Sequence, residues 1–219
     1  MDVAVIADIV GSRRLPDRSE AQRTFERVVA QAEFDLPLAV EPLQATAGDE
    51  LQGRYATLDA ALASLLLVQL ALPAGHELRF GIGVGAIRAI DGGGSGAAPR
   101  LQDGPAWWAA RAAIDTVHAR QQRAVPTSRI WIVGAPEEDA RMHTTIDVAN
   151  AYALARDELV MRMSPRERRL VYGRSLGRTQ AELAGDEGIS QSAVSQALAS
   201  AGAASVVLGF EALQGRARS

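Results

Sequence analysis

The pattern of apolar and polar positions predicts a mixed fold in the first half of the chain. Residues 3–7 form a continuous apolar run typical of a buried strand, and residues 18–34 follow with apolar positions at helical spacing. Two short strands are expected around a turn within residues 43–55, then an apolar helix at 56–72 and a strand at 78–87. The order βαββαβ predicts an α+β, ferredoxin-like domain in which helices cover one face of an antiparallel sheet.

The second half of the pattern predicts helices. A helix is expected to start at Asp103-Gly104-Pro105 and to run to about residue 122. A short strand at 128–133 and an amphipathic helix at 145–163 follow. Two capping boxes, Ser164-Pro165-Arg166-Glu167 and Thr179-Gln180-Ala181-Glu182, predict further helix starts. We therefore expect a first domain over residues 1–145, a connecting helix over 146–163 and an all-α domain over 164–219.

The spacing after the second capping box is typical of a helix-turn-helix. Ala184, Gly188 and Val194 fall at its small, turn and buried aliphatic positions, and Ser190 is expected to cap a third helix. That helix would offer side chains to base edges in a DNA major groove, namely Gln191, Ser192, Ser195 and Gln196. It carries no arginine, so phosphate contacts would come from flanking arginines such as Arg178. The alternative is a helix-turn-helix used for protein contacts or dimerisation.

Composition sets the class of protein. An apolar content of 47% with 22% charged residues is typical of a soluble globular chain, and the absence of cysteine excludes disulfides and thiol chemistry. No secretory signal is evident and the apolar stretch 60–72 is too short to span a bilayer, so we expect a cytoplasmic protein without a membrane segment. Residues 1–163 hold 16 arginines against 21 acids, whereas residues 164–219 hold 7 against 5, so the sign of the charge changes at the predicted boundary.

Acidic residues stand at two separate predicted turns. Asp8 follows the first strand, and Asp49 and Glu50 lie at the turn between the next two. If these strands are neighbours, the carboxylates meet, which suits Mg²⁺ or Mn²⁺ carrying a nucleotide because such ions take one or two carboxylates plus phosphate oxygens. The alternative is that the acids only stabilise turns. Gly81, Gly83 and Gly85 leave one face of a strand bare, either for a ligand or for another backbone.

Four motifs resemble, in order, the catalytic domains of class III nucleotide cyclases: Asp8-Ile9-x-Gly11-Ser12, Gly48-Asp49-Glu50, Arg79-x-Gly81-Ile82-Gly83-x-Gly85 and Ala109-Ala110-Arg111. With the helix-turn-helix added, the whole chain resembles the SatD family. The cyclase resemblance implies that Asp8 and Asp49 bind metal, with Glu50 as a third candidate carboxylate. It also implies that residues of the first motif lie near phosphates, namely Ile9, Gly11 and Ser12.

The sequence departs from the cyclase pattern at two points. Cyclases place a sugar-orienting asparagine four residues before the helical arginine, where this chain has Trp107. Adenylate cyclases select their base with a lysine, and this chain contains no lysine, so the resemblance does not assign the base. Trp107, Trp108 and Arg111 lie within one helical turn of each other, so a base could stack there with Arg111 on a phosphate. The alternative is that the tryptophans fill the core or a dimer interface.

These observations predict a homodimeric, DNA-binding transcriptional regulator whose cyclase-like domain binds a nucleotide with a divalent metal and thereby modulates DNA binding. The alternative is a divergent nucleotide cyclase or nucleotidyltransferase that uses two-metal chemistry. The enzyme question stays open, with a non-catalytic nucleotide sensor preferred. The three histidines, His76, His118 and His143, lie far apart in the sequence and are given no role.

Overall fold

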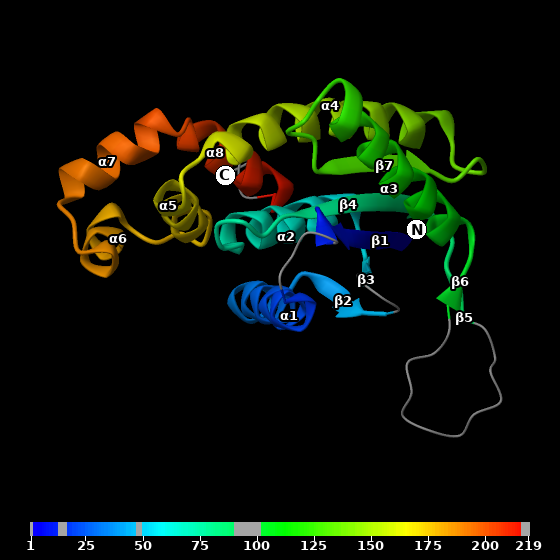
Figure 1. Ribbon diagram of the computed structural model, residues 1–219. Helices are drawn as coiled ribbons and strands as arrows, with labels where there is room; N and C mark the ends of the chain where they lie inside the picture. The colour runs from blue at the N-terminus through cyan, green and yellow to red at the C-terminus, as the bar shows by residue number, and fades with distance from the viewer. Residues whose placement is uncertain (1, 13–16, 47–49, 90–101, 216–219) are drawn as a thin grey trace.

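The computed structural model describes residues 2–12, 17–46, 50–89 and 102–215 (Figure 1). It is a mixed α+β structure built on a five-stranded sheet of order β2-β3-β1-β4-β7. The strands of this sheet are β1 (Asp2–Ile9), β2 (Ala39–Ala45), β3 (Glu50–Tyr55), β4 (Leu78–Gly85) and β7 (Ile130–Gly134). The first four strands pair antiparallel, and β7 joins β4 in parallel. A separate two-stranded sheet is formed by β5 (Arg88–Ala89) and β6 (Gln102–Asp103).

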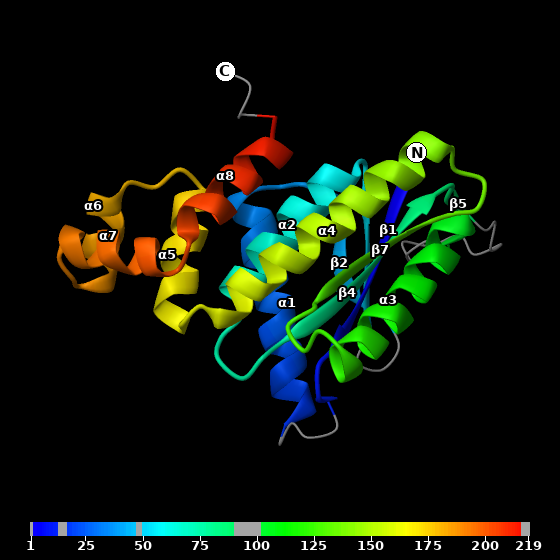
Figure 2. The same cartoon turned by 90° about the horizontal axis from the view of Figure 1, so that it is seen from above.

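Helices cover both faces of the sheet (Figures 1 and 2). They include α1 (Arg18–Asp35) and α2 (Leu58–Ala71) on one face and α3 (Pro105–Arg123) on the other. The central strand β1 shows why: Val3, Val5 and Ala7 join the core under α1 and α2, while Ala4 and Ile6 pack against α3. A strand buried on both faces has a continuous apolar run, which is the pattern seen in the sequence.

The glycines of β4 accommodate the backbone of α3. A Cβ atom added at Gly83 would lie 1.9 Å from the carbonyl oxygen of Ala106, and one added at Gly81 would lie 2.4 Å from that of Ala110. Of the two alternatives for the bare strand face, the structure therefore shows close approach of another backbone. This contact fixes α3 directly above the sheet and so sets the position of its side chains at the strand ends.

Helix α4 (Ala140–Arg162) begins earlier than the helix predicted from residue 145, because Asp139 caps it by accepting a hydrogen bond from the Met142 amide. It runs along the free edge of β7 rather than acting only as a connection. The side chain of Asn150 bonds both the amide and the carbonyl of Ile132, each at 2.9 Å. Asp157 accepts from the amides of Arg129 and Ile130 at 2.7 and 2.9 Å. These side chains satisfy the backbone groups that a sixth strand would otherwise pair.

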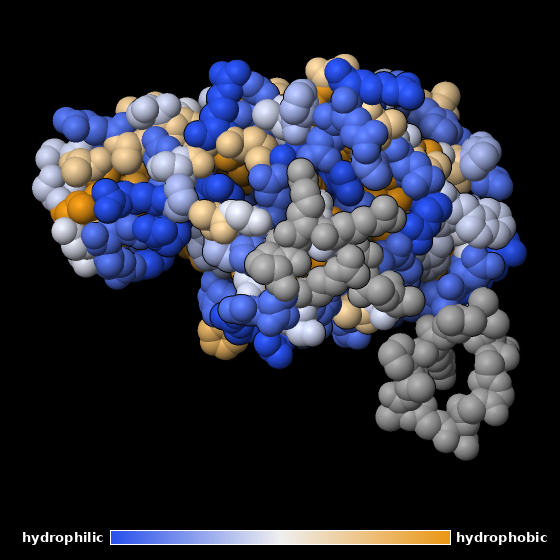
Figure 3. All heavy atoms as spheres, viewed as in Figure 1, coloured by the Kyte–Doolittle hydropathy of each residue, from blue (hydrophilic) through white to orange (hydrophobic). Residues whose placement is uncertain are grey.

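Four helices follow α4 and form a lobe that projects from the sheet (Figures 1 and 3). They are α5 (Pro165–Ser175), α6 (Gln180–Glu187), α7 (Gln191–Ser200) and α8 (Ala203–Leu213). Both predicted capping boxes are present, at the starts of α5 and α6. Helices α5 and α8 contact α2, and Leu170 and Phe210 belong to the same buried cluster as α2. The lobe therefore shares the core of the sheet region at one end and carries α6 and α7 at the other.

Within the described ranges, no single helix has both the length and the apolar composition needed to cross a bilayer. Helices α7 and α8 reach that composition only when taken together, and they are bent by 80° relative to each other.

Candidate functional site

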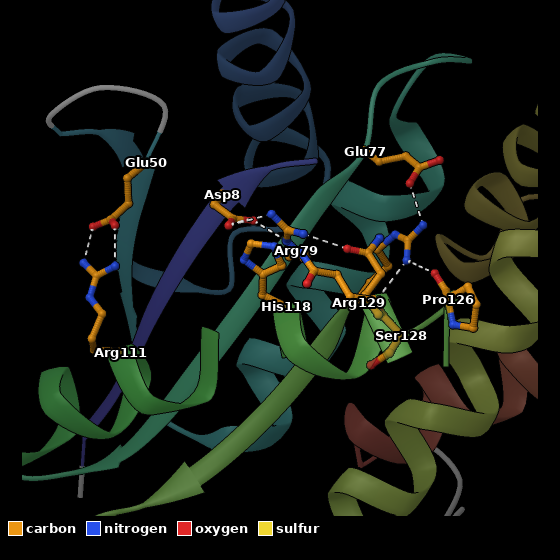
Figure 4. Close-up of polar contacts among 11 residues, drawn as sticks. Asp8, Glu50, Glu77, Arg79, Arg111, His118, Pro126, Ser128 and Arg129 are labelled. Carbon is orange, nitrogen blue, oxygen red and sulfur yellow. Dashed lines mark hydrogen bonds and ion pairs between the residues drawn. The ribbon is translucent and has the colours of Figure 1, made fainter. Parts of the chain in front are cut away.

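The acidic residues of two neighbouring strands meet at one end of the sheet. In the antiparallel pairing, Asp8 of β1 lies opposite Glu50 of β3 on one side and Arg79 of β4 on the other. Residues directly opposite in such a pairing project from the same face, here the face covered by α3. The structure thus brings together two of the three predicted metal ligands (Figure 4). The third, Asp49, lies outside the described residues.

Arg79 holds Asp8 in a bidentate ion pair. Its Nε donates to Asp8 Oδ1 at 2.7 Å, its Nη2 to Oδ2 at 2.9 Å, and its Nη1 to Gln121 Oε1 of α3 at 2.7 Å. The Arg79 side chain is only 9% exposed, so this charge depends on Asp8 for compensation. Each oxygen of Asp8 consequently accepts a charge-assisted hydrogen bond.

Arg111 of α3 holds Glu50 in the same way. Its Nη1 lies 2.7 Å from Glu50 Oε2, and its Nη2 donates to Oε1 at 2.9 Å. The hydrogen bond with Glu50 raises the pKa of Arg111 further above its already high value, so the guanidinium remains a cation. Unlike Arg79, the Arg111 side chain is 51% exposed.

The two ion pairs lie on a cavity of about 740 Å³. Its lining includes the three residues predicted near phosphates, Ile9, Gly11 and Ser12, in the segment that follows β1. Helix α3 contributes a row of polar side chains that the sequence reading missed: Asp115, His118, Gln121 and Gln122. The sequence contains a signal for this row in its helical spacing. The face of Arg111 also carries Asp115, His118 and Gln122, at successive steps of four, three and four residues. His118, given no role before, lines the cavity and contacts the Gln122 amide at 2.6 Å.

The donor set suits a divalent cation in part. Two carboxylates on adjacent strands match the one or two that Mg²⁺ takes together with phosphate oxygens. Both, however, are bound to guanidinium groups, and the described part of the chain offers no group of three His, Cys, Asp or Glu side chains placed to hold a metal. Asp8 and Glu50 could therefore hold a cation only if their arginines find other partners.

The predicted stacking residues lie outside this cavity. Trp107 packs against the cluster formed by Ala4, Ile6 and α3, and it does not line the cavity. Its indole is partly buried against that cluster. Trp108 is 63% exposed and donates from Nε1 to Asp103 Oδ1 at 2.9 Å. The structure therefore brings Arg111 to the site without an indole.

A third ion pair, between Arg129 and Glu77, stabilises the turn that leads into β7. Arg129 donates to Glu77 at 2.5 Å and to the carbonyl oxygens of Pro126 and Ser128 at 2.7 and 2.9 Å (Figure 4). These bonds fix the turn before β7. Arg129 is not among the residues that line the cavity.

The predicted DNA-contacting residues lie together on α7. Val194 and Leu198 are buried, whereas Gln191, Ser192, Ser195 and Gln196 are exposed.

Arg178, predicted to contact phosphates, is paired with Asp186 at 2.5 Å, and the hydrogen bond with Asp186 raises the pKa of its guanidinium. Arg169 forms a bidentate pair with Glu187 at 2.6 and 2.7 Å, which holds the pKa of Glu187 below its usual value. Acids of α6 thus partner one arginine of α5 and one of the segment between α5 and α6.

Comparison with known proteins identifies a family. A sequence model described as the SatD family matches residues 2–208. No curated protein sequence matches the chain. Among solved structures, a bacterial light-regulated adenylyl cyclase is similar at 13% sequence identity and a TM-score of 0.43, covering 57% of this chain and 71% of that one. A likeness at this level carries no information on activity.

Proposed function

The chain belongs to the SatD family, and from the geometry of its cavity we propose that it is a DNA-binding regulator controlled by a nucleotide. In this proposal the cyclase-like region over residues 1–145 binds the nucleotide with Mg²⁺ or Mn²⁺, and α6 and α7 bind DNA. The observation that carries it is the meeting of Asp8 and Glu50 on adjacent strands, in one cavity with Arg79 and Arg111. Carboxylates for a cation and guanidinium groups for phosphates are the two components that metal–nucleotide binding requires.

The residues around the cavity suit different parts of such a ligand. Asp8 and Glu50 would hold the cation, which when bound neutralises phosphate charge. Arg111, half exposed and on the cavity, would bind phosphate oxygens, and the segment Ile9–Ser12 lines the cavity beside Asp8. The amide and imidazole groups of α3 offer donors and acceptors to the remainder of the ligand.

The strand arrangement supports the cyclase-like assignment. The order β2-β3-β1-β4 with antiparallel pairing is the order expected of a ferredoxin-like domain. Trp107 supports binding without turnover, because this position carries the sugar-orienting asparagine in the cyclases that the sequence resembles, and here a partly buried indole packs against the cluster of Ala4, Ile6 and α3. The enzyme alternative is tested by incubation with each nucleoside triphosphate and Mn²⁺, and a cyclic or linked product would replace the sensor proposal.

Helices α6 and α7 have the features of a helix-turn-helix. Gly188 ends α6 with a φ of 63°, Ser190 caps α7, and Leu183, Ala184, Val194 and Leu198 are buried between the helices. The exposed face of α7 then presents glutamine and serine side chains, which can hydrogen-bond base edges. A symmetric dimer would present two such helices to paired half-sites.

Nucleotide binding is tested by thermal denaturation of the full chain with Mn²⁺ and, separately, ATP, GTP, CTP or UTP. At a hundredfold excess over Kd, one nucleotide should raise the melting temperature by about 5–10 °C. Arg111→Gln should remove most of this rise, because the half-exposed guanidinium contributes to ligand binding more than to folding. Arg54→Gln, which removes a similar ion pair with Glu41 outside the cavity, should retain it. A wild-type protein that responds to none of the four would reject the proposal.

DNA binding is tested by mobility shift with a fragment that contains the protein's own promoter region. Gln196→Ala should weaken the complex by about 1–3 kcal/mol, since a base contact is lost. Gln31→Ala, an exposed glutamine on α1, should leave it unchanged. Affinity should also fall steeply as salt rises, because phosphate contacts release counterions. A complex that is insensitive to both Gln196→Ala and salt would contradict the assignment of α7.

A further inference from the structure

We propose that Arg79 is a phosphate-binding residue that exchanges partners when ligand binds. In the structure it neutralises Asp8. In the complex it would leave Asp8 to the divalent cation and bind a phosphate group of the nucleotide instead. This inference rests on the proposed nucleotide-binding function, and its consequence is that metal and nucleotide bind only weakly alone and strongly together.

The geometry of Asp8 argues against metal binding alone. Both of its oxygens accept hydrogen bonds from Arg79, at 2.7 and 2.9 Å. A cation that takes these oxygens must displace the guanidinium or lie beside it, and like charges at such separations repel. Displacement leaves Arg79, 9% exposed, without a counter-charge. Mn²⁺ by itself is therefore a poor ligand for this site.

The same pair argues against nucleotide binding alone. A phosphate that recruits Arg79 removes the partner of Asp8, and the freed carboxylate then stands beside an anion. Two negative groups without an intervening cation are unfavourable in a partly buried site. When cation and phosphate arrive together, Asp8 pairs with the cation and Arg79 with the phosphate, so every charge keeps a partner.

The Arg111–Glu50 ion pair is more exposed than the Arg79–Asp8 pair, and this difference assigns the coupling between metal and nucleotide to Arg79. Arg111 is half exposed, so water can solvate it once it leaves Glu50, and its release costs little. Arg79 lacks this access. Its bond to Gln121, at 2.7 Å, involves Nη1 and not the nitrogens that contact Asp8, so α3 can hold the guanidinium in the cavity while its other partner changes.

The test is calorimetric titration of the full chain with Mn²⁺ alone, with each of the four nucleoside triphosphates in EDTA, and with each nucleotide in saturating Mn²⁺. We expect the affinity for Mn²⁺ to rise about 10- to 100-fold when a binding nucleotide is saturating. By linkage, the affinity for that nucleotide should rise by the same factor in Mn²⁺. Equal Mn²⁺ affinity with and without a bound nucleotide would overturn the exchange.

Two variants should shift the two affinities in opposite directions. Arg79→Gln frees Asp8, so Mn²⁺ alone should bind about tenfold more tightly than in the wild type, whereas nucleotide with Mn²⁺ should bind about tenfold more weakly. Asp8→Asn frees Arg79, so nucleotide in EDTA should bind more tightly and lose its dependence on Mn²⁺. A residue that only supports the fold would weaken both affinities when replaced, and that result would refute the inference. Far-UV circular dichroism checks that each variant is folded, and Arg54→Gln serves as the control.

The outcomes separate this inference from the proposed function. If no nucleotide binds but Arg79→Gln gains affinity for Mn²⁺, the competition for Asp8 stands and the nucleotide proposal fails. If nucleotide binds and Arg79→Gln leaves both affinities unchanged, the proposed function stands and the exchange is rejected.

Discussion

Replacing Gly83 by alanine should destabilise the protein by about 3 kcal/mol or more, at the upper end of what overpacking costs. The added methyl group would lie 1.9 Å from the Ala106 carbonyl oxygen and 2.3 Å from the Ala110 amide nitrogen. Both are backbone atoms, so no side chain can rotate away, and the whole of α3 must move. Because Arg111 and Gln121 are on this helix, their bonds to Glu50 and Arg79 should weaken as well.

Urea denaturation of the wild type and the Gly83→Ala variant measures this effect. The matched control is Gly185→Ala in α6, where an added Cβ meets nothing within 4 Å. In a helix interior this change should stabilise by about 0.5–1 kcal/mol. If Gly83→Ala lowers the free energy of unfolding by less than about 1 kcal/mol, α3 does not approach β4 as closely as the structure shows.

The second large effect is expected at Asp157. Its carboxylate is fully buried and accepts hydrogen bonds from the amides of Arg129 and Ile130, with Arg156 and Gln69 near its other oxygen. Asp157→Ala removes these acceptors and leaves the buried Arg156 guanidinium without its only carboxylate partner in the described structure. Breaking one side of a buried pair in this way should cost about 3–5 kcal/mol.

The same denaturation experiment checks this prediction. Asp157→Asn can keep one oxygen for the two amides and should cost less than Asp157→Ala, although it loses the charge and turns its NH2 group toward the donors of Gln69 and Arg156. The neighbouring Glu158→Gln is the control, since Glu158 is partly exposed and pairs with Arg162 at the surface. Equal losses of stability for the alanine and asparagine variants would show that the charged oxygen facing Gln69 and Arg156, not the bonds to the two amides, sets the contribution of this position.

Local signals in the sequence were sufficient for much of the fold. The apolar run of β1, the period of α1 and both capping boxes predicted elements that the structure contains. These signals depend on neighbours within a few residues. The start of α4 was missed because its first turn is held by an Asp139 cap outside the apolar pattern. The role of α4 in satisfying β7 depends on contacts across the fold, such as Asn150 with Ile132, which no local pattern contains.

The site was predicted in the same uneven way. The sequence predicts Asp8, Asp49 and Glu50 as one group because acids at turns after strands are visible in it. The register places Asp8 opposite Glu50, and Asp49 lies outside the described residues. The sequence shows Arg79 only as part of a glycine motif, since its ion pair with Asp8 requires the pairing of β1 with β4. Trp107 shares a helix face with Arg111 by spacing, yet its indole packs, partly buried, against the cluster of Ala4, Ile6 and α3 and does not line the cavity. Spacing defines a helix face, and only packing decides what that face meets.

The lobe packs on the rest of the molecule through its first and its last helix, because α5 and α8 both contact α2. A lobe joined to the sheet region by one flexible linker could reorient freely. This lobe packs on α2 through both its first and its last helix, so it cannot rotate without opening the core around Phe210. If the protein is the nucleotide-controlled, DNA-binding dimer that we propose, the signal should therefore change the distance or angle between two whole subunits, with each lobe moving as one piece with its own sheet.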